Sequence, residues 1–205
     1  MYARQGYRKF ASVGFPGSVG CFSGMNDAGL AVVSHEVFAP LGRGFDPRGV
    51  PFAAAVRHIL ETCATLSQAE AYLRSIARAS SVSLVACDQV EVAVFECSPE
   101  RVERRDAEGG VSICTNHFRS KSLAVASPPD TFGSVGRHRL LERVVASGSE
   151  LGVTDLFAIL HAVNMGPLTL HSMVFEPANL RLHLSIGPGP ASAIPPTELR
   201  LSDWF

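Results

Sequence analysis

Apolar residues recur at helical spacing in two adjacent segments of the first half of the chain. In residues 51–63 they form one stripe, and Pro51 suits the first turn of a helix. In residues 65–77 the same spacing follows Ser67, which we predict as the N-cap, with Glu70 three residues later as in a capping box. The stripes consist of Phe52, Ala55, Val56, Ile59, Leu60 and Cys63 in the first segment, and of Ala69, Tyr72, Leu73 and Ile76 in the second.

Alternating or continuous apolar runs bounded by turn residues indicate strands elsewhere in the chain. A hairpin is expected over residues 22–33, where polar and glycine residues separate two apolar runs. Residues 170–189 predict strand, turn and strand, because every second residue from Leu180 to Ile186 is apolar. Further strands are expected at 81–88 and 90–98 and, as a pair around a glycine turn, at 101–118.

Two more helices are expected after the central strands, over 134–147 and 154–164, the second with Thr154 as its N-cap. Strand pairs thus alternate with helix pairs, and no linker or repeat interrupts this order. Two antiparallel sheets packed face to face, with helices outside them, bury this number of strands. We therefore predict one α+β domain over residues 1–205.

The composition narrows the class of protein only slightly. Hydrophobic residues make up 46% and charged residues 18% of the 205, and 18 basic side chains oppose 19 acidic ones. This balance gives no reason to expect nucleic acid or a membrane as a partner, and the apolar stretches are shorter than the roughly 18 residues of a membrane span. Residues 1–15 carry positive charge without a continuous apolar core, so they do not predict a secretory signal.

The five cysteines are an odd number without C-x-x-C spacing, which argues against a disulfide framework and a structural zinc site. The histidines show no metal-ligand spacing either, so neither a metal nor another cofactor is expected. Reduced thiols favour a cytoplasmic protein. The cysteines are Cys21, Cys63, Cys87, Cys97 and Cys114.

Cys21 raises the question of whether the chain carries its own nucleophile. A reactive thiol needs a lowered pKa, which a helix N-terminus, a cation or a base provides. The only base close in sequence is His35, on the returning strand of the predicted hairpin. Cys21 itself falls within the incoming strand, between Gly20 and Phe22. We interpret it as a buried strand thiol, and nucleophilic catalysis is the alternative.

Five sequence blocks occur in an order that resembles a known family. The blocks are "PGSVGCFSGMNDAGLAV", "ETCATLSQAEAYL", "CTNHF", "GSVGRHRLLERV" and "TLHSMVFEPANLRLHLSIGPGPA". Together they resemble the isopenicillin-N acyltransferase family, relatives of the bile-salt and penicillin V hydrolases in the N-terminal-nucleophile (Ntn) superfamily. The resemblance implies an αββα sandwich of two antiparallel sheets between helix layers. It also implies amide hydrolysis or acyl transfer through an acyl-cysteine, on a small-molecule amide or acyl substrate.

The resemblance further implies parts that this chain lacks. In the family the nucleophile is a terminal cysteine exposed by self-cleavage, whose α-amino group, with a pKa near 8, acts as the general base. It lies before the block that matches residues 10–30, whereas no cysteine precedes Cys21 here. We therefore expect the nucleophile and the first hairpin to be missing and the chain to be inactive alone, unless an N-terminal segment or a partner chain supplies them. The alternative is a non-catalytic binding module on the same scaffold.

Three site residues are carried over from the resemblance. Asn116 matches an asparagine that helps to hold the oxyanion, a role that suits an uncharged amide donor; the alternative is a turn asparagine that caps its own backbone. Ser172 matches a serine kept near the site, and Arg137 matches an arginine beside the nucleophile, so both are predicted to bind substrate. The alternatives are a polar residue on an exposed strand face for Ser172 and a solvated helix arginine for Arg137.

Three neighbouring residues are interpreted differently. His117, next to Asn116, is interpreted as structural, because the family needs no histidine base. His35 and Glu36 end the hairpin strand, where related hydrolases place a second oxyanion donor. An ionised Glu36 side chain has no proton to donate, so that role does not suit it.

Overall fold

The computed structural model describes residues 1–38, 45–125, 130–146 and 150–205, and within them it shows two antiparallel sheets and four α-helices. The predicted α+β class is confirmed. The six-stranded sheet runs in chain order through β1 (Phe10–Val13), β2 (Ser23–Asn26), β3 (Ala31–Glu36), β4 (Val82–Cys87), β5 (Val92–Cys97) and β6 (Val102–Asp106). The three-stranded sheet contains β7 (His171–Glu176), β8 (Arg181–Ile186) and β9 (Thr197–Arg200).

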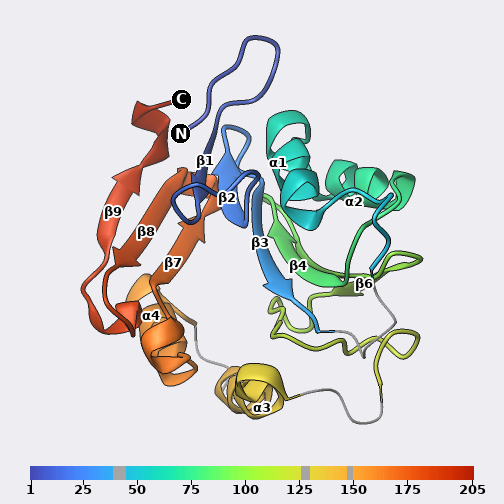
Figure 1. The fold of residues 1–205 in the computed structure, drawn as a ribbon. Helices are drawn as coiled ribbons and strands as arrows, with labels where there is room; N and C mark the ends of the chain where they lie inside the picture. Colours follow the sequence, from blue (N-terminus) through green and yellow to red (C-terminus); the bar gives the residue numbers. More distant parts are fainter. Residues whose placement is uncertain (39–44, 126–129, 147–149) are drawn as a thin grey trace.

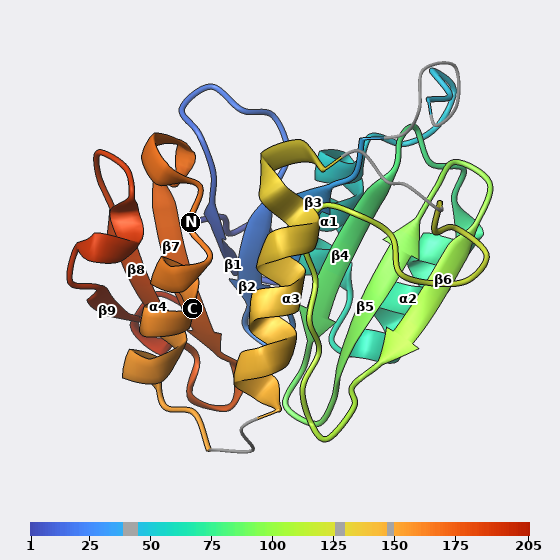
Figure 2. The ribbon, with the colours of Figure 1, turned by 90° about the horizontal axis from the view of Figure 1, so that it is seen from below.

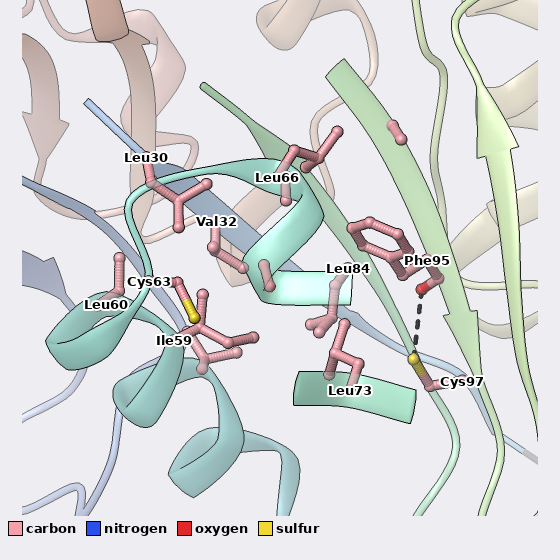
Figure 3. Close-up of a cluster of buried hydrophobic side chains, with 14 of the residues drawn as sticks. Leu30, Val32, Ile59, Leu60, Cys63, Leu66, Leu73, Leu84, Phe95 and Cys97 are labelled. Carbon is pink, nitrogen blue, oxygen red and sulfur yellow. Dashed lines mark hydrogen bonds between the residues drawn. The ribbon is translucent and has the colours of Figure 1, made fainter. Parts of the chain in front are cut away.

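Helices α1 (Phe52–Thr62) and α2 (Leu66–Ser75) cover one face of the six-stranded sheet (Figure 1). Figure 3 shows the apolar cluster between them, where Ile59 and Leu73 from the helices lie against Leu84 and Phe95 from the strands. These four side chains are at most 2% exposed. Burial of each such side chain contributes about 1.5–3 kcal/mol relative to exposure, so this cluster holds the helices on the sheet.

A second apolar cluster joins the two sheets. Side chains alternate along a strand, so Phe10 of β1 points to the helices, whereas Ala11 and Val13 belong to the second cluster. There they meet Met25 of β2 and Leu182 of β8. The three-stranded sheet therefore packs against the β1 end of the larger sheet, as the placement of β7 beside β1 shows (Figure 1).

The remaining helices, α3 (Ser134–Val145) and α4 (Val153–Ala162), lie on the side of the molecule away from α1 and α2 (Figure 2). Helix α4 packs against β7, and α3 follows a short 3-10 turn at Thr131–Gly133. The range predicted for the third helix extends to Ser147, which lies outside the described residues. No helix in the described part of the chain is long and apolar enough to cross a membrane.

The predicted start of the second helix is wrong by two residues. The N-cap of α2 is Thr65 and not Ser67, and the Thr65 hydroxyl accepts the N–H of Gln68 at 3.3 Å. The Gln68 side chain in turn accepts the N–H of Ala64 at 2.6 Å. Reciprocal bonds of this kind satisfy the first donors of a helix, and Glu70 instead forms ion pairs beyond the helix start.

The predicted start of the last helix is also two residues too late in the sequence. The N-cap of α4 is Gly152, whose N–H donates to the carboxylate of Asp155 at 2.9 Å. The predicted cap, Thr154, lies in the first turn. In α4, as in α2, the side chain that bonds back stands three residues after the true N-cap.

Two strand predictions also need correction. Cys21 precedes β2, and its N–H donates to the carbonyl of Ala53 in α1 at 2.9 Å. The predicted pair at 101–118 is β6 followed by a turn at Glu108–Val111, and residues 112–118 stay outside the sheet because other partners bind them, as described below. Strands β1 and β9, of four residues each, were not predicted from the sequence.

Candidate functional site

Asn116 and Arg137, predicted separately, meet in the structure. Arg137 of α3 donates from Nη2 to Oδ1 of Asn116 at 2.8 Å and from Nε to the carbonyl of Phe132 at 3.0 Å. Nδ2 of Asn116 donates to the carbonyl of Glu36, at the end of β3, at 2.9 Å. A guanidinium only donates, so it requires the oxygen of Asn116 to face it. The second Nδ2 proton forms no hydrogen bond with the described residues and is available to a ligand.

A polar network beneath α3 holds the backbone at Asn116. The N–H of Asn116 donates to Oγ of Ser134, a fully buried residue, at 2.8 Å. Nδ1 of His117 lies 2.8 Å from the same Oγ and 3.2 Å from Oγ1 of Thr115. Burial, aided by the positive charge of Arg119, lowers the pKa of His117, so its ring is neutral near pH 7. These contacts support a structural role for His117.

An ion pair between a buried carboxylate and a partly exposed arginine fixes the base of the same segment. Glu96 of β5 is 0% exposed, and its Oε1 accepts Nε of Arg105 at 2.7 Å. The same carboxylate accepts the N–H groups of Arg119 and Ser120, each at 2.8 Å. Nη2 of Arg105 donates to the carbonyl of Ile113 at 3.0 Å. Both ends of the 113–120 segment are therefore bound to one ion pair.

His35 lies on the same side of the sheet as these groups. It stands opposite Ser83 across β3 and β4, on the face directed away from α1 and α2. Burial, with the positive charge of Arg137, lowers the pKa of His35 to about 4, so its imidazole is neutral near pH 7. Its ring nitrogens form no hydrogen bond with the described residues. Glu36 contributes only its main-chain carbonyl to Asn116.

Two exposed phenylalanines border the Asn116–Arg137 pair. Phe38 and Phe132 are 42% and 47% exposed, and their ring centroids are 6.1 Å apart. Phe132 has a φ of 57°, which is uncommon for a bulky side chain and costs on the order of 1–3 kcal/mol. Its carbonyl is the one that accepts Nε of Arg137. An exposed pair of aromatic rings is thus linked to Arg137 through the backbone of Phe132.

Ser172 lies apart from this centre. It is 5% exposed on β7, so the alternative of an exposed strand position is wrong. It shares a strand face with Val174, whereas Met173 and Phe175 join the cluster between the sheets. No hydrogen bond or ring contact among the described residues connects Ser172 to Asn116 or Arg137. A role for Ser172 in substrate binding stays a prediction.

All five cysteines lie in the described residues, and none has the surroundings of a nucleophile. Cys21 is 1% exposed in the cluster beneath α1, and burial raises its pKa. His35 lies on the opposite face of the sheet, so it does not activate this thiol. Burial also raises the pKa of Cys114, in the Asn116 segment, to about 12. Burial raises the pKa of the other thiols as well, those of Cys63, Cys87 and Cys97.

The site offers hydrogen-bond donors and no metal centre. Within residues 1–38, 45–125, 130–146 and 150–205, no group of three or more His, Cys, Asp or Glu side chains is arranged to hold a metal ion. The amide of Asn116 keeps one N–H without a partner among the described residues, beside the positive charge of Arg137. Donors held in advance of reaction are suited to stabilise negative charge that develops on a substrate oxygen.

Sequence reasoning missed the residues that support Asn116. Glu96 stands between Phe95 and Cys97 in an otherwise apolar strand, and a carboxylate there signals a buried partner. Its partner Arg105 lies in a run of charged residues that gives no such signal. Ser134 begins a helix and is buried, although its sequence position resembles an ordinary N-terminal turn.

The fold of this chain is similar to those of Ntn-type hydrolases. Two variants of the conjugated bile acid hydrolase from Clostridium perfringens match with TM-scores of 0.63 and 0.64 at 12% and 13% identity, over 94% of this chain and 76% of the hydrolase. Penicillin V acylase from Agrobacterium tumefaciens matches with a TM-score of 0.59 at 17% identity, over 88% of this chain and 65% of the acylase. At these identities the likeness concerns the fold.

The chain belongs to the AAT (acyl-coenzyme A:6-aminopenicillanic acid acyl-transferase) family, whose model matches residues 1–189. This match confirms the resemblance found in the five sequence blocks. A search of curated protein sequences gave no match. The chain is thus a member of a family of amidases and acyltransferases with an Ntn-hydrolase-like fold.

Proposed function

We propose that this chain forms the oxyanion-binding part of a site for amide hydrolysis or acyl transfer through an acyl-cysteine. The observation that carries the proposal is the fixed orientation of Asn116, whose oxygen binds Arg137 and whose amide donates one proton to Glu36 and keeps the other without a partner among the described residues. A substrate carbonyl placed there accepts the free Nδ2 proton as negative charge develops on its oxygen. Arg137 contributes positive charge beside that oxygen and holds the amide in its orientation.

The nucleophile in this proposal comes from outside residues 1–205. Burial raises the pKa of every thiol in the chain, which disfavours the thiolate that attacks a carbonyl. The chain alone is then inactive, and a further polypeptide segment or a partner chain brings the cysteine to Asn116. Two antiparallel sheets joined by an apolar cluster, with α1 and α2 on one side and α4 on β7, support the αββα sandwich of the family.

The second candidate function is binding without turnover. The raised pKa values of the five cysteine thiols favour binding without turnover if no other polypeptide joins the site. The ligand is again a small amide or acyl compound, since the donor at Asn116 and the exposed rings of Phe38 and Phe132 are unchanged. The two candidates differ only in whether a cysteine reaches the bound carbonyl.

The test separates binding from turnover. Hexanamide, a small acyl amide, is titrated into the ¹⁵N-labelled 205-residue chain while the backbone amide signals of residues 113–120 are followed by NMR, so that the same readout serves the parent chain and its Asn116→Ala variant. We expect saturable shifts, and an affinity about tenfold lower in Asn116→Ala, whereas Asn179→Ala, at an exposed turn, leaves the affinity unchanged. Binding that is equal in Asn116→Ala and the parent protein contradicts the proposal.

The source of the nucleophile is tested by expression from the native locus with its upstream DNA. A longer product, or two chains split before a cysteine, with amidase activity supports the enzyme. Its Asn116→Ala variant is then expected to lose about 10²–10³ in kcat. A single inactive species beginning at Met1 that still binds hexanamide supports the binding module. Fast alkylation of native Cys21 by iodoacetamide contradicts both, because it makes that thiol the nucleophile.

A further inference from the structure

We propose that the ion pair between the buried Glu96 and Arg105 positions Asn116 for ligand binding and acts only through that residue. The inference rests on the proposed function, because the role of Asn116 is the one assigned there. It adds two positioning residues that lie beneath the site and have no part in the chemistry. Both belong to the rigid sheet, on β5 and β6.

The donors around Glu96 require a carboxylate. Oε1 accepts Nε of Arg105 and the N–H of Arg119, and Oε2 accepts the N–H groups of Arg119 at 3.0 Å and Ser120 at 2.8 Å. Every partner is a donor, so both oxygens must accept. A glutamine at this position has one accepting oxygen and one NH2 group, and the NH2 group would face an N–H. The side chain is 0% exposed, so water does not replace a lost bond there.

The ion pair transmits its position to Asn116 through a short path. Arg105 holds the carbonyl of Ile113, three residues before Asn116, and Glu96 holds the N–H of Arg119, three residues after it. A loop pinned so close on both sides has little conformational freedom. The hydrogen bonds of Asn116 with Glu36 and Arg137 depend on the position in which the loop holds the Asn116 backbone above the sheet.

The register of the sheet connects the ion pair to the other side of the site. Glu96 stands opposite Ser83 across β5 and β4, and Ser83 stands opposite His35 across β4 and β3. The next residue of β3 is Glu36, whose carbonyl accepts the amide of Asn116. The base of the loop and the acceptor for its side chain are thus built on one continuous sheet, two strands apart.

The experiment compares Glu96→Gln with Glu103→Gln in the ¹⁵N-labelled chain without ligand. Glu103 lies directly opposite Glu96 on β6, and its side chain is 32% exposed and pairs with Arg101 at 3.5 Å, so it is a matched control outside the buried site. We expect the side-chain amide order parameter of Asn116 to fall from about 0.8 to below about 0.6 in Glu96→Gln only. The side-chain amide of Asn26, buried on the helix side, is the internal reference and stays unchanged.

A double-mutant cycle distinguishes positioning from general destabilisation. Glu96→Gln is expected to lower hexanamide affinity about tenfold in the parent chain and less than about twofold in the Asn116→Ala background. An equal loss in both backgrounds overturns the inference, and so does an unchanged Asn116 signal. Equal affinity of the parent chain and Asn116→Ala overturns the proposed function instead, while the relaxation data still decide the positioning role. If Glu96→Gln does not fold, Glu96→Asp serves instead, because it keeps the charge on a side chain one methylene shorter. We expect it to lower the Asn116 order parameter and the hexanamide affinity in the same way, but by less.

Discussion

Phe95 and Glu96 are neighbours in sequence, but they face two chemically opposite environments. Both are 0% exposed. Phe95 packs in the apolar cluster under α1 and α2 (Figure 3), whereas Glu96 points to the other face and binds Arg105 and two backbone N–H groups. One strand thus supports a core on one side and the candidate site on the other.

The two faces tolerate change differently. On the helix face the stabilisation grows with buried apolar area, so a smaller side chain costs free energy in a graded way. On the site face each buried donor needs its own acceptor, and one missing partner costs the full desolvation penalty. Changes under the helices should therefore act on stability alone, and changes beneath Asn116 on both stability and ligand binding.

The largest expected effect is on the helix face. Phe95→Ala should lower the free energy of unfolding by about 3–5 kcal/mol, because it leaves a cavity in a fully buried cluster. Urea unfolding measures this loss, and hexanamide affinity of the folded fraction should not change. A parallel loss of affinity would show that the two faces are not independent. Phe95→Leu, which leaves a smaller void, serves if the alanine variant does not fold.

Arg105→Met is the corresponding change on the site face. It leaves the buried Glu96 carboxylate without its cation, so we expect a loss of about 3 kcal/mol in unfolding free energy. Unlike Phe95→Ala, it should also weaken hexanamide binding, measured by the same titration. Arg101→Met removes an exposed partner of Glu103 and should change neither quantity. Unchanged binding in Arg105→Met would separate the ion pair from the site.

Acid should weaken the site face before the helix face. Folding lowers the pKa of His35 to about 4 through burial and Arg137, so the unfolded chain binds a proton that the folded chain does not. Stability is then constant above about pH 6.5 and falls as the pH drops toward 4. His117 and His138, whose pKa values burial also lowers, act in the same direction. His35→Gln should remove about 1 kcal/mol of the loss between pH 7.5 and 5.5, as measured by thermal or urea unfolding; an unchanged pH dependence would contradict the assignment.

The smallest effect is expected at an ion pair within α1. Glu61 pairs with Arg57 one helical turn away, at 2.9 Å. Glu61→Gln should cost only about 0.3–0.5 kcal/mol, because the Arg57 side chain is 40% exposed and solvent screens its charge. Chemical denaturation in low and high salt measures it, and a loss above about 1 kcal/mol would mean that surface charge matters as much as either face of the sheet.

The sequence predicted local features well and spatial relations poorly. The stripe from Phe52 to Cys63 gave α1 because helical spacing is a local property. The resemblance identified Asn116 and Arg137, but their contact depends on how α3 packs, which no local pattern encodes. Residues 112–118 were predicted as a strand, yet Arg105 binds the carbonyl of Ile113 and Ser134 binds the N–H of Asn116, so these backbone groups do not pair with a strand. Partners distant in sequence therefore decided the site.

The hydrogen bond between Asn116 and Glu36 joins residues 80 positions apart. A contact of that separation forms only after the intervening strands have paired, so it belongs to the slow, late part of folding. A ligand held by Asn116 binds the finished sheet and not its precursors. Such a ligand is therefore expected to slow unfolding while leaving the rate of folding unchanged.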